Sequence, residues 1–481
     1  MDAILNIVNA VNSVLWDWVL LFLLCGTGIY FTFRLKFIQV RKFGAGFKKL
    51  FSGFSFKGKK NSDGGMTSFQ SFATAIAAQV GTGNLAGAAA AMIAGGPGAI
   101  FWMWVSAFFG MATIYVEATL AQKYRRLDEN GSIVGGPVYY ITAVFQGKFG
   151  KILAAIFSVL VMIALGFTGN MVQSNSIGEA FQSTFASFGI TWQIGGVNMI
   201  PVIVGVVIAI FAFLIFVGGV SRIASVTEKI VPIMAGFYIL GALIVIFVNI
   251  TEIPHAFAQI VVGAFSPGAA LGAAVGIGIQ KAIRFGVSRG LFSNEAGMGS
   301  TPHAHAIAKV KRPGDQGLVA MTSVFIDTFV ILTMTALVIL VTGVLPDGIN
   351  GLYSGIDLTQ AGFSKVFGSF GSIFIAICSL FFAFSTIIGW YFFGEANIRY
   401  LFGKKAVKVY AVIVSLLVIV GCFLKVDLVW ALSDCFNGLM VIPNLIALLA
   451  LSGVAVKMMR DYEHETRLES PKIPKKNKTK C

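Results

Sequence analysis

The chain has 481 residues, of which 57% are hydrophobic and only 12% are charged. Soluble domains carry about 25% charged residues, so this composition excludes a soluble enzyme, a fibrous protein, a disordered chain and a disulfide scaffold. The formal net charge of +15 resembles that of a nucleic-acid-binding protein. However, the basic residues gather in a few loops, as a membrane topology requires, and we expect no nucleic-acid partner.

Eleven apolar stretches are long enough to cross a bilayer as helices, which takes about 20 residues each. They cover residues 15–33, 69–94, 98–122, 152–180, 200–219, 230–250, 268–290, 318–344, 367–393, 405–424 and 428–456. The first stretch is not a signal peptide, because residues 1–12 contain no Lys or Arg. The sequence therefore predicts an all-α, multi-pass protein of the plasma membrane.

Lys and Arg are distributed very unevenly over the connecting loops. With the N-terminus outside, 34 of the 36 fall on the cytoplasmic side, and only Lys365 and Lys425 fall outside. This count assigns residues 281–312 to one cytoplasmic segment. Because cytoplasmic loops are enriched in Lys and Arg, we expect an external N-terminus and a cytoplasmic C-terminus. The end of the basic tail, residues 471–481, is expected to be solvated and disordered and to contact anionic membrane lipid.

One N-terminal helix precedes ten further spans, which divide into two blocks of five. Because five is odd, the second block starts from the opposite side of the membrane, which is the topology of an inverted repeat and a common plan among secondary transporters. We therefore expect four regions. They are an N-terminal helix with a basic cytoplasmic loop (1–68), a first repeat (69–250), a second repeat (251–456) and the cytoplasmic tail (457–481).

The span 69–94 is interrupted at its centre by Gln-Val-Gly-Thr-Gly-Asn, residues 79–84. Each glycine disfavours a helix interior by about 1 kcal/mol relative to alanine, and irregular backbone at this depth survives only where it is buried in protein or lines a polar cavity. The freed N–H groups of Gly81, Thr82 and Gly83 can bind a carboxylate. The freed carbonyls, with the Asn84 side chain, can bind a hard cation.

Other interpretations of the motifs are weaker. Gly83 and Gly87 fit the small-xxx-small pattern of a helix-packing seam, which stays open as an alternative. Residues 81–87 lack the GxGxxG spacing of a dinucleotide loop, and residues 286–290 match GxSxG without a strand-to-helix turn. The sequence has no Walker A motif, no mid-membrane histidine, no metal-binding cluster and no repeated pore motif. An ATP-driven pump, an intramembrane enzyme and an ion channel are therefore disfavoured.

Two long motifs, GTGNLAGAAAAMIAGGPGAIFWMW at 81–104 and AIRFGVSRGLFSNEAGMGSTPHAHA at 282–306, resemble the alanine or glycine:cation symporter family. The resemblance extends over essentially the whole chain. It implies a LeuT-type fold, in which two inverted repeats of five helices follow one additional N-terminal helix. The implied activity is Na⁺-coupled symport of small neutral amino acids, chiefly alanine and glycine, by alternating access. A bacterial monomer with Na⁺ as coupling ion and no cofactor is expected.

The resemblance also implies roles for individual residues in substrate binding. The substrate carboxylate would meet the backbone at 81–83, and its ammonium group would meet carbonyls near Gln79. Thr386 and Trp390 lie one turn apart and would face the substrate, with Trp390 leaving room only for a small side chain. A second break at Gly276 and Gly278 would make Ile279 and Gln280 pocket-lining residues. The alternatives are a membrane-interface position for the tryptophan and ordinary helix packing for the other two.

A cation site is implied in the same way. The second sodium site of such folds would combine the carbonyls of Ala77, Val80 and Phe382 with the hydroxyls of Ser385 and Thr386. Neutral oxygen ligands suit a hard monovalent cation. The first sodium site would centre on Asn84, while Asp327 occupies the place of an expected neutral amide, so its remaining ligands stay open.

Intramembrane acidic residues are functional sites by default. Glu117 and Asp327 can bind a proton or a cation, or they can be structural groups paired with arginine or hydroxyls. Glu295 can anchor a cytoplasmic gate to Arg284 or Arg289, or it can be a solvated loop charge. A preference for glutamine or D-amino acids, and coupling to H⁺, remain alternatives within the symporter interpretation.

Overall fold

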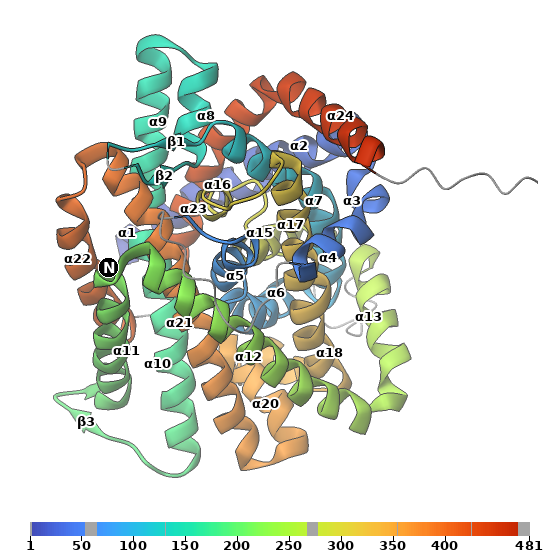
Figure 1. Cartoon of the computed structure of the whole chain (residues 1–481). Helices are drawn as coiled ribbons and strands as arrows, with labels where there is room; N and C mark the ends of the chain where they lie inside the picture. Colours follow the sequence, from blue (N-terminus) through green and yellow to red (C-terminus); the bar gives the residue numbers. More distant parts are fainter. Residues whose placement is uncertain are drawn as a thin grey trace, which may run out of the picture.

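The computed structural model describes residues 2–52, 65–129, 131–266, 278–353, 355–424 and 426–469, which are almost entirely helical (Figure 1). The first helices are α1 (Asp2–Val14), η1 (Leu15–Val19), α2 (Leu20–Arg34), α3 (Ile38–Arg41), α4 (Phe43–Ser52), α5 (Ser68–Gln79), η2 (Gly83–Gly87), α6 (Ala88–Gly95), α7 (Gly98–Lys123), α8 (Pro137–Val144), α9 (Gly147–Val161), η3 (Met162–Gly169), α10 (Asn170–Ser187), α11 (Met199–Val217) and α12 (Gly219–Val248).

The later helices are η4 (Ile250–Glu252), α13 (Ile253–Phe265), α15 (Ile279–Asn294), α16 (Pro302–Ala306), α17 (Pro313–Val324), η5 (Phe325–Leu332), α18 (Thr333–Val341), α19 (Leu345–Ile349), α20 (Gly355–Phe367), α21 (Ser369–Phe402), α22 (Ala406–Gly421), α23 (Val426–Ala450) and α24 (Ser452–Glu469). Two short antiparallel hairpins pair β1 (Arg126–Leu127) with β2 (Ile133–Val134), and β3 (Gln193–Ile194) with β4 (Val197–Asn198).

Among the described residues, eight helices are long and apolar enough to cross a membrane. A ninth span consists of α5 and the segment Gly83–Gly95, which are bent by 47° at the break between them. These helices confirm a multi-pass membrane protein. α22 is a shorter apolar helix, and α15 with α16 would add one more broken span, so the count of eleven spans stays a prediction. The boundaries of the two repeats stay predictions as well.

The broken helix lies at the centre of the fold (Figure 1). It begins with a capping box, in which Thr67 Oγ1 accepts from the Gln70 N–H and Gln70 Oε1 accepts from the Thr67 N–H, both at 3.0 Å. Every residue from 69 to 89 is buried. α12, α17 and α21 pack around α5, and α15 and α20 pack on η2. The irregular backbone is therefore enclosed by protein rather than by lipid, as hydrogen bonding at this depth demands.

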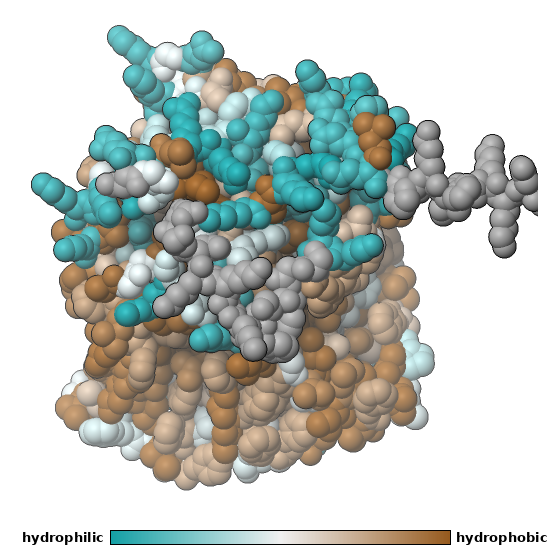
Figure 2. Space-filling model, in the orientation of Figure 1, coloured by the Kyte–Doolittle hydropathy of each residue, from teal (hydrophilic) through white to brown (hydrophobic). Residues whose placement is uncertain are grey.

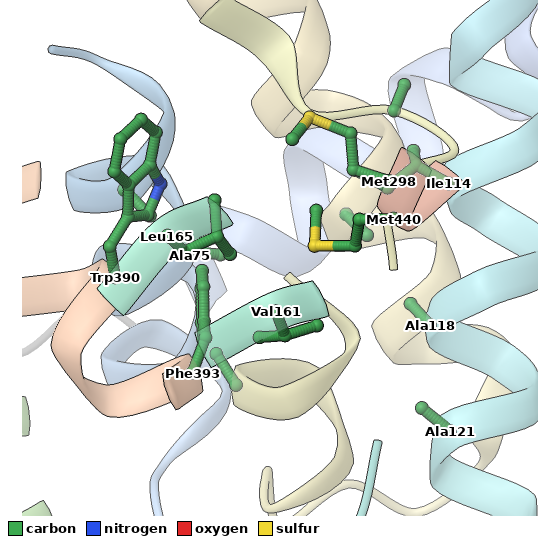
Figure 3. Packing of buried hydrophobic residues seen from close by; sticks show 14 of the residues in the cluster. Ala75, Ile114, Ala118, Ala121, Val161, Leu165, Met298, Trp390, Phe393 and Met440 are labelled. Atoms are coloured by element: carbon green, nitrogen blue, oxygen red, sulfur yellow. The ribbon is translucent and has the colours of Figure 1, made fainter. Parts of the chain in front are cut away.

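Close packing joins the broken helix to α21 and η3. Trp390 and Phe393 of α21 lie in the same buried cluster as Ala75 of α5 and Leu165 of η3 (Figure 3). Gly169 permits this arrangement, because a Cβ at that position would lie 2.5 Å from the Trp390 ring. The additional N-terminal helix packs elsewhere, with α1 and α2 against α23 and α2 also against α7.

Polar and apolar surface are separated along the molecule. In Figure 2, hydrophilic residues gather at the end that carries β1, β2, α8, α9 and α24, and hydrophobic residues cover most of the remaining visible face. The hydrophobic part of this face has the character of a lipid-facing surface. The polar end carries the basic loop 123–151, which the sequence assigns to the cytoplasmic side.

The assignment of residues 281–312 to one cytoplasmic segment is wrong. The Lys281 carbonyl lies beside Gly95, whereas the Lys309 N–H donates to the Met66 carbonyl at 2.9 Å. Gly95 and Met66 are at opposite ends of the broken helix. With the predicted orientation, Lys281, Arg284 and Arg289 would be counted with the outer residues, and the distribution would become 31 to 5. These three basic residues lie within α15 rather than in a loop that follows the predicted span 268–290.

Candidate functional site

The backbone leaves the helix at Val80 and resumes as η2 at Gly83. Between these points the Gly81 N–H donates to Asn84 Oδ1, and the Thr82 N–H donates to Gln173 Oε1 of α10, both at 3.0 Å. Side chains thus replace the backbone partners that a continuous helix would supply. The predicted break is confirmed, and both donors face polar groups that a ligand carboxylate can replace.

Both glycines also allow a close approach of neighbouring helices. A Cβ at Gly81 would lie 2.4 Å from Thr386 Oγ1 and 2.9 Å from Gln173 Oε1. A Cβ at Gly83 would lie 3.0 Å from Ser293 Cα. Gly87, the second residue of the proposed packing seam, has only one neighbour at 3.7 Å. The tight contacts therefore concentrate at the break rather than along a seam.

Two buried polar atoms at the break have no hydrogen-bond partner among the described residues. They are Oε1 of Gln79 and Oγ1 of Thr82. A buried polar atom without a hydrogen-bond partner destabilises the folded protein by about 1–3 kcal/mol. A water or a ligand group is therefore expected at each of the two atoms. The Gln79 amide nitrogen, in contrast, donates to the Asn294 carbonyl at 2.7 Å. This bond ties the first break to α15.

A second break follows α15. Glu295 adopts a left-handed conformation (φ 58°), as do Gly297 (φ 93°) and Gly299 (φ 79°), before the chain enters α16. The sequence predicts this break at Gly276 and Gly278 instead. Gly276 lies outside the described residues, and Gly278 is the N-cap of α15, which runs uninterrupted to Asn294. The missed cue was a second pair of glycines one residue apart, Gly297 and Gly299, the pattern that revealed the first break.

Ile279 and Gln280 are consequently not brought to the first break. They form the first turn of α15 and are exposed. The neighbouring Lys281 lies beside Gly95, twelve residues from Gly83 and hence about 18 Å along a helix. The structure gives no support to a pocket-lining role for either residue. The residues of α15 that approach the first break include Phe292, Ser293 and Asn294.

Glu295 is fully buried, and it accepts hydrogen bonds from Trp390 Nε1 and Ser300 Oγ. The expected pairing with arginine is wrong, because Arg284 pairs with Asp17 at 3.0 Å and Arg289 with Asp434 at 2.6 Å. Trp390 is also fully buried, and its ring meets Phe292 edge-on at 5.5 Å between centroids. It therefore has an interior position, not that of a membrane-interface aromatic.

Glu117 of α7 holds the second break in place. Its carboxylate accepts from the N–H groups of Gly297 at 3.1 Å and Gly299 at 2.9 Å, and from Asn444 Nδ2 at 2.6 Å. Tyr140 donates in turn to Asn444 Oδ1. A buried carboxylate needs such donors to offset its lost hydration. The arrangement gives Glu117 a positioning role, with backbone amides as partners in place of the expected arginine or hydroxyls.

The predicted cation ligands of α5 and α21 are adjacent. Thr386 Oγ1 donates to the Ala77 carbonyl at 2.9 Å and to the Phe382 carbonyl at 3.1 Å. Ser385 Oγ donates to the same two carbonyls at 3.3 Å and 2.9 Å. Val80 ends α5 three residues after Ala77. A cluster of hydroxyl and carbonyl oxygens at a helix break is the kind of site that binds Na⁺ in transporters, so the residues fit that ion.

Asn84 and Asp327 are in direct contact. The Asp327 carboxylate accepts from Asn84 Nδ2 at 2.8 Å, from Ser293 Oγ at 3.0 Å and from Thr328 Oγ1 at 2.9 Å. These groups come from η2, α15 and η5, so one buried carboxylate links the first break to two further helices. Their side chains are fully buried, and this cluster has the oxygen ligands and the negative charge that a cation requires.

The family model of the sodium:alanine symporters matches residues 1–477. The chain belongs to the sodium:alanine symporter family. It is 43% identical over 467 residues to the sodium/alanine symporter AgcS of Methanococcus maripaludis, which covers 97% of this chain and 98% of that protein. It is also 43% identical over 463 residues to the probable sodium/glutamine symporter GlnT of Bacillus subtilis, covering 96% and 91% of the two chains.

The fold of this sodium:alanine symporter family member is similar to that of MhsT in complex with L-phenylalanine. The TM-score is 0.55 at 16% identity, over 85% of this chain and 99% of that chain. The LeuT-type fold is thereby confirmed. Together with the family match, it identifies the protein as a multi-pass membrane transporter for Na⁺-coupled amino-acid symport.

Replacing Glu117 tests its positioning role. Alanine removes the acceptor of two backbone N–H groups at the second break, so we expect amino-acid affinity to fall about tenfold or more. Glutamine retains one acceptor oxygen and should have a smaller effect. Binding of labelled alanine to the purified variants checks this expectation. The yield of folded protein in detergent is measured in parallel. Unchanged affinity in folded Glu117→Ala would contradict it.

Proposed function

We propose that the protein imports small neutral amino acids, with alanine and glycine preferred, together with Na⁺ by alternating access. The observation that carries the proposal is the break at residues 80–83, where two backbone N–H donors lie beside the hydroxyl cluster of Ser385 and Thr386. A substrate carboxylate binds the N–H groups of Gly81, Thr82 and Gly83, and its ammonium group binds carbonyls near Gln79. Ala77, Val80, Phe382, Ser385 and Thr386 hold a Na⁺ ion.

The preference for small side chains follows from the groups around the break. Trp390 is held by Glu295 and by the close approach of Gly169, and Phe292 packs against its ring. A tryptophan fixed from two sides cannot move aside without breaking these contacts. It limits the space for a substrate side chain, so alanine and glycine fit better than glutamine. The relative named as a glutamine symporter keeps glutamine as the second candidate.

The Asn84–Asp327 cluster supplies a second cation position. Its carboxylate balances one positive charge, which neutral carbonyls and hydroxyls alone do not. Na⁺ is the ion that the family favours, and a proton on Asp327 is the alternative. The protein is a monomer in a bacterial plasma membrane, with an external N-terminus and a cytoplasmic C-terminus. The distribution of Lys and Arg supports this orientation.

Competition for uptake of labelled alanine tests the substrate assignment. Unlabelled alanine and glycine should compete well, serine less well, and glutamine about tenfold more weakly or worse, since each tenfold reflects about 1.4 kcal/mol. D-Alanine reports on stereochemical selectivity. Competition by glutamine that equals competition by glycine would contradict the size limit assigned to Trp390.

A further inference from the structure

A cavity of about 220 Å³ lies away from the first break at residues 80–83. Its walls come from the β1–β2 hairpin, the first turn of α8, the turn between α11 and α12, α16, and the C-terminal part of α21. Its polar lining includes Tyr139, His303, Glu395 and Arg399. One bound water needs about 10–15 Å³ of such space, so the cavity has room for a molecule of several heavy atoms.

The cavity is separate from the site at the first break and lies towards the predicted cytoplasmic side. Glu395 follows Thr386 by nine residues of α21, or about 14 Å of helix. Ile307 lines the cavity, and its carbonyl accepts from the Met66 N–H at 3.1 Å, just before α5 begins. The β1–β2 hairpin belongs to the polar end of the molecule (Figure 2).

Two opposite charges face this space. Glu395 is 8% exposed, and its Oε2 has no hydrogen-bond partner of normal geometry among the described residues. The Tyr391 hydroxyl, one turn earlier on α21, lies near the same carboxyl. Arg399 follows one turn later on the same helix face, yet the two form no ion pair within 4.0 Å in the described structure. The Arg399 guanidinium lies 3.8 Å from Asp128 Oδ2, beyond normal hydrogen-bond length. Arginine has five N–H donors, so donors remain for a ligand.

A buried carboxylate oxygen without a donor is unfavourable, and an ammonium group is a strong donor for it. A guanidinium one helical turn away is a matching partner for a ligand carboxylate. We propose that this cavity binds a small zwitterionic amino acid, with its ammonium group at Glu395 and its carboxylate at Arg399. The proposal rests on the proposed function, because the transported amino acid is then the molecule released on this side.

A chain of hydrogen bonds connects the cavity to the second break. Trp390 donates to Glu295, Ser300 donates to Glu295, and His303 Nδ1 donates to the Ser300 carbonyl at 2.7 Å. Asn397 Nδ2 donates to His303 Nε2 at 2.9 Å, which requires a neutral imidazole with its proton on Nδ1. An amino acid in the cavity therefore contacts the same segment that positions Trp390. Because this segment borders the proposed substrate site, an amino acid bound from the cytoplasm is expected to slow substrate release.

Equilibrium binding of labelled alanine to the purified full-length protein tests the cavity. None of the proposed Na⁺ ligands is among the residues that line the cavity, so its binding should persist when choline replaces Na⁺. Glu395→Gln and Arg399→Gln should each weaken this Na⁺-independent binding about tenfold or more. The conservative variants Glu395→Asp and Arg399→Lys should lose less. Na⁺-dependent binding should survive in all four variants and serves as the control for folding.

The unmodified protein supplies a second measurement. Ethylamine and propionate each carry only one of the two charges, so both should compete for Na⁺-independent binding about tenfold more weakly than glycine. Absence of Na⁺-independent binding, or binding that neither Glu395→Gln nor Arg399→Gln weakens, would overturn the proposal. If the unmodified protein shows Na⁺-independent binding but no Na⁺-dependent binding, the result would instead contradict the proposed function.

Discussion

Alanine at position 81 is expected to reduce Na⁺-dependent amino-acid binding by tenfold or more while the protein still folds and inserts. A Cβ there would lie 2.4 Å from Thr386 Oγ1 and 2.9 Å from Gln173 Oε1, and overpacking of this kind costs about 1–3 kcal/mol. The strain falls on a proposed cation ligand and on the partner of the Thr82 N–H. Alanine also favours a continuous helix over the break.

Gly87→Ala is the matched control, because its Cβ would meet only one atom at 3.7 Å. It should bind normally. A packing seam predicts a different pattern, in which both substitutions lower the amount of folded protein and the folded fraction binds normally. Substrate affinity measured beside the yield of folded protein in detergent separates these outcomes. Normal affinity in folded Gly81→Ala would return the motif to the packing interpretation.

Thr386→Ala should lower Na⁺ affinity more strongly than it lowers amino-acid affinity at saturating Na⁺. The substitution removes one oxygen of the proposed cation site. It also removes one hydrogen-bond donor from the buried carbonyls of Ala77 and Phe382. Loss of a ligand or donor at such a site costs about 1–3 kcal/mol, which corresponds to about fivefold to 150-fold in affinity. Ser385→Ala should act in the same direction.

Thr386→Ser keeps the hydroxyl and is therefore the control for Thr386→Ala. Binding of labelled alanine across a series of Na⁺ concentrations gives the apparent Na⁺ affinity of each variant. If the Thr386 hydroxyl binds Na⁺, the apparent Na⁺ affinity of Thr386→Ser should remain close to that of the unmodified protein. Equal losses in the serine and alanine variants, or an unchanged Na⁺ dependence in Thr386→Ala, would show that the hydroxyl does not bind the ion.

The sequence predicted those features that have a local signal. Apolar stretches of sufficient length indicated the spans, and two closely spaced glycines in an apolar helix located the break at Gly81 and Gly83. A second pair with the same spacing, Gly297 and Gly299, did not lead to a predicted break. Arg284, Arg289 and Glu295 give this region the charge of a cytoplasmic loop. Each of these charged side chains has a buried or half-buried partner from a distant helix.

Long-range contacts account for the other differences. Only the family resemblance placed Asp327 near Asn84; no local signal in the sequence indicates that its carboxylate receives the Asn84 amide, 243 residues away. The bond from Gly299 to Glu117 spans 182 residues. Ile279 and Gln280 directly follow Gly278, whereas the break that the structure describes lies after Asn294, at the other end of α15. Hydrogen bonds between residues so far apart arise only from the packing of whole helices.

The most direct test of the central claim is alanine uptake into proteoliposomes that contain the purified protein. An inward Na⁺ gradient should drive accumulation of labelled alanine, choline in place of Na⁺ should abolish it, and a pH gradient alone should not restore it. Uptake that is unchanged in choline and follows the pH gradient would contradict Na⁺-coupled symport.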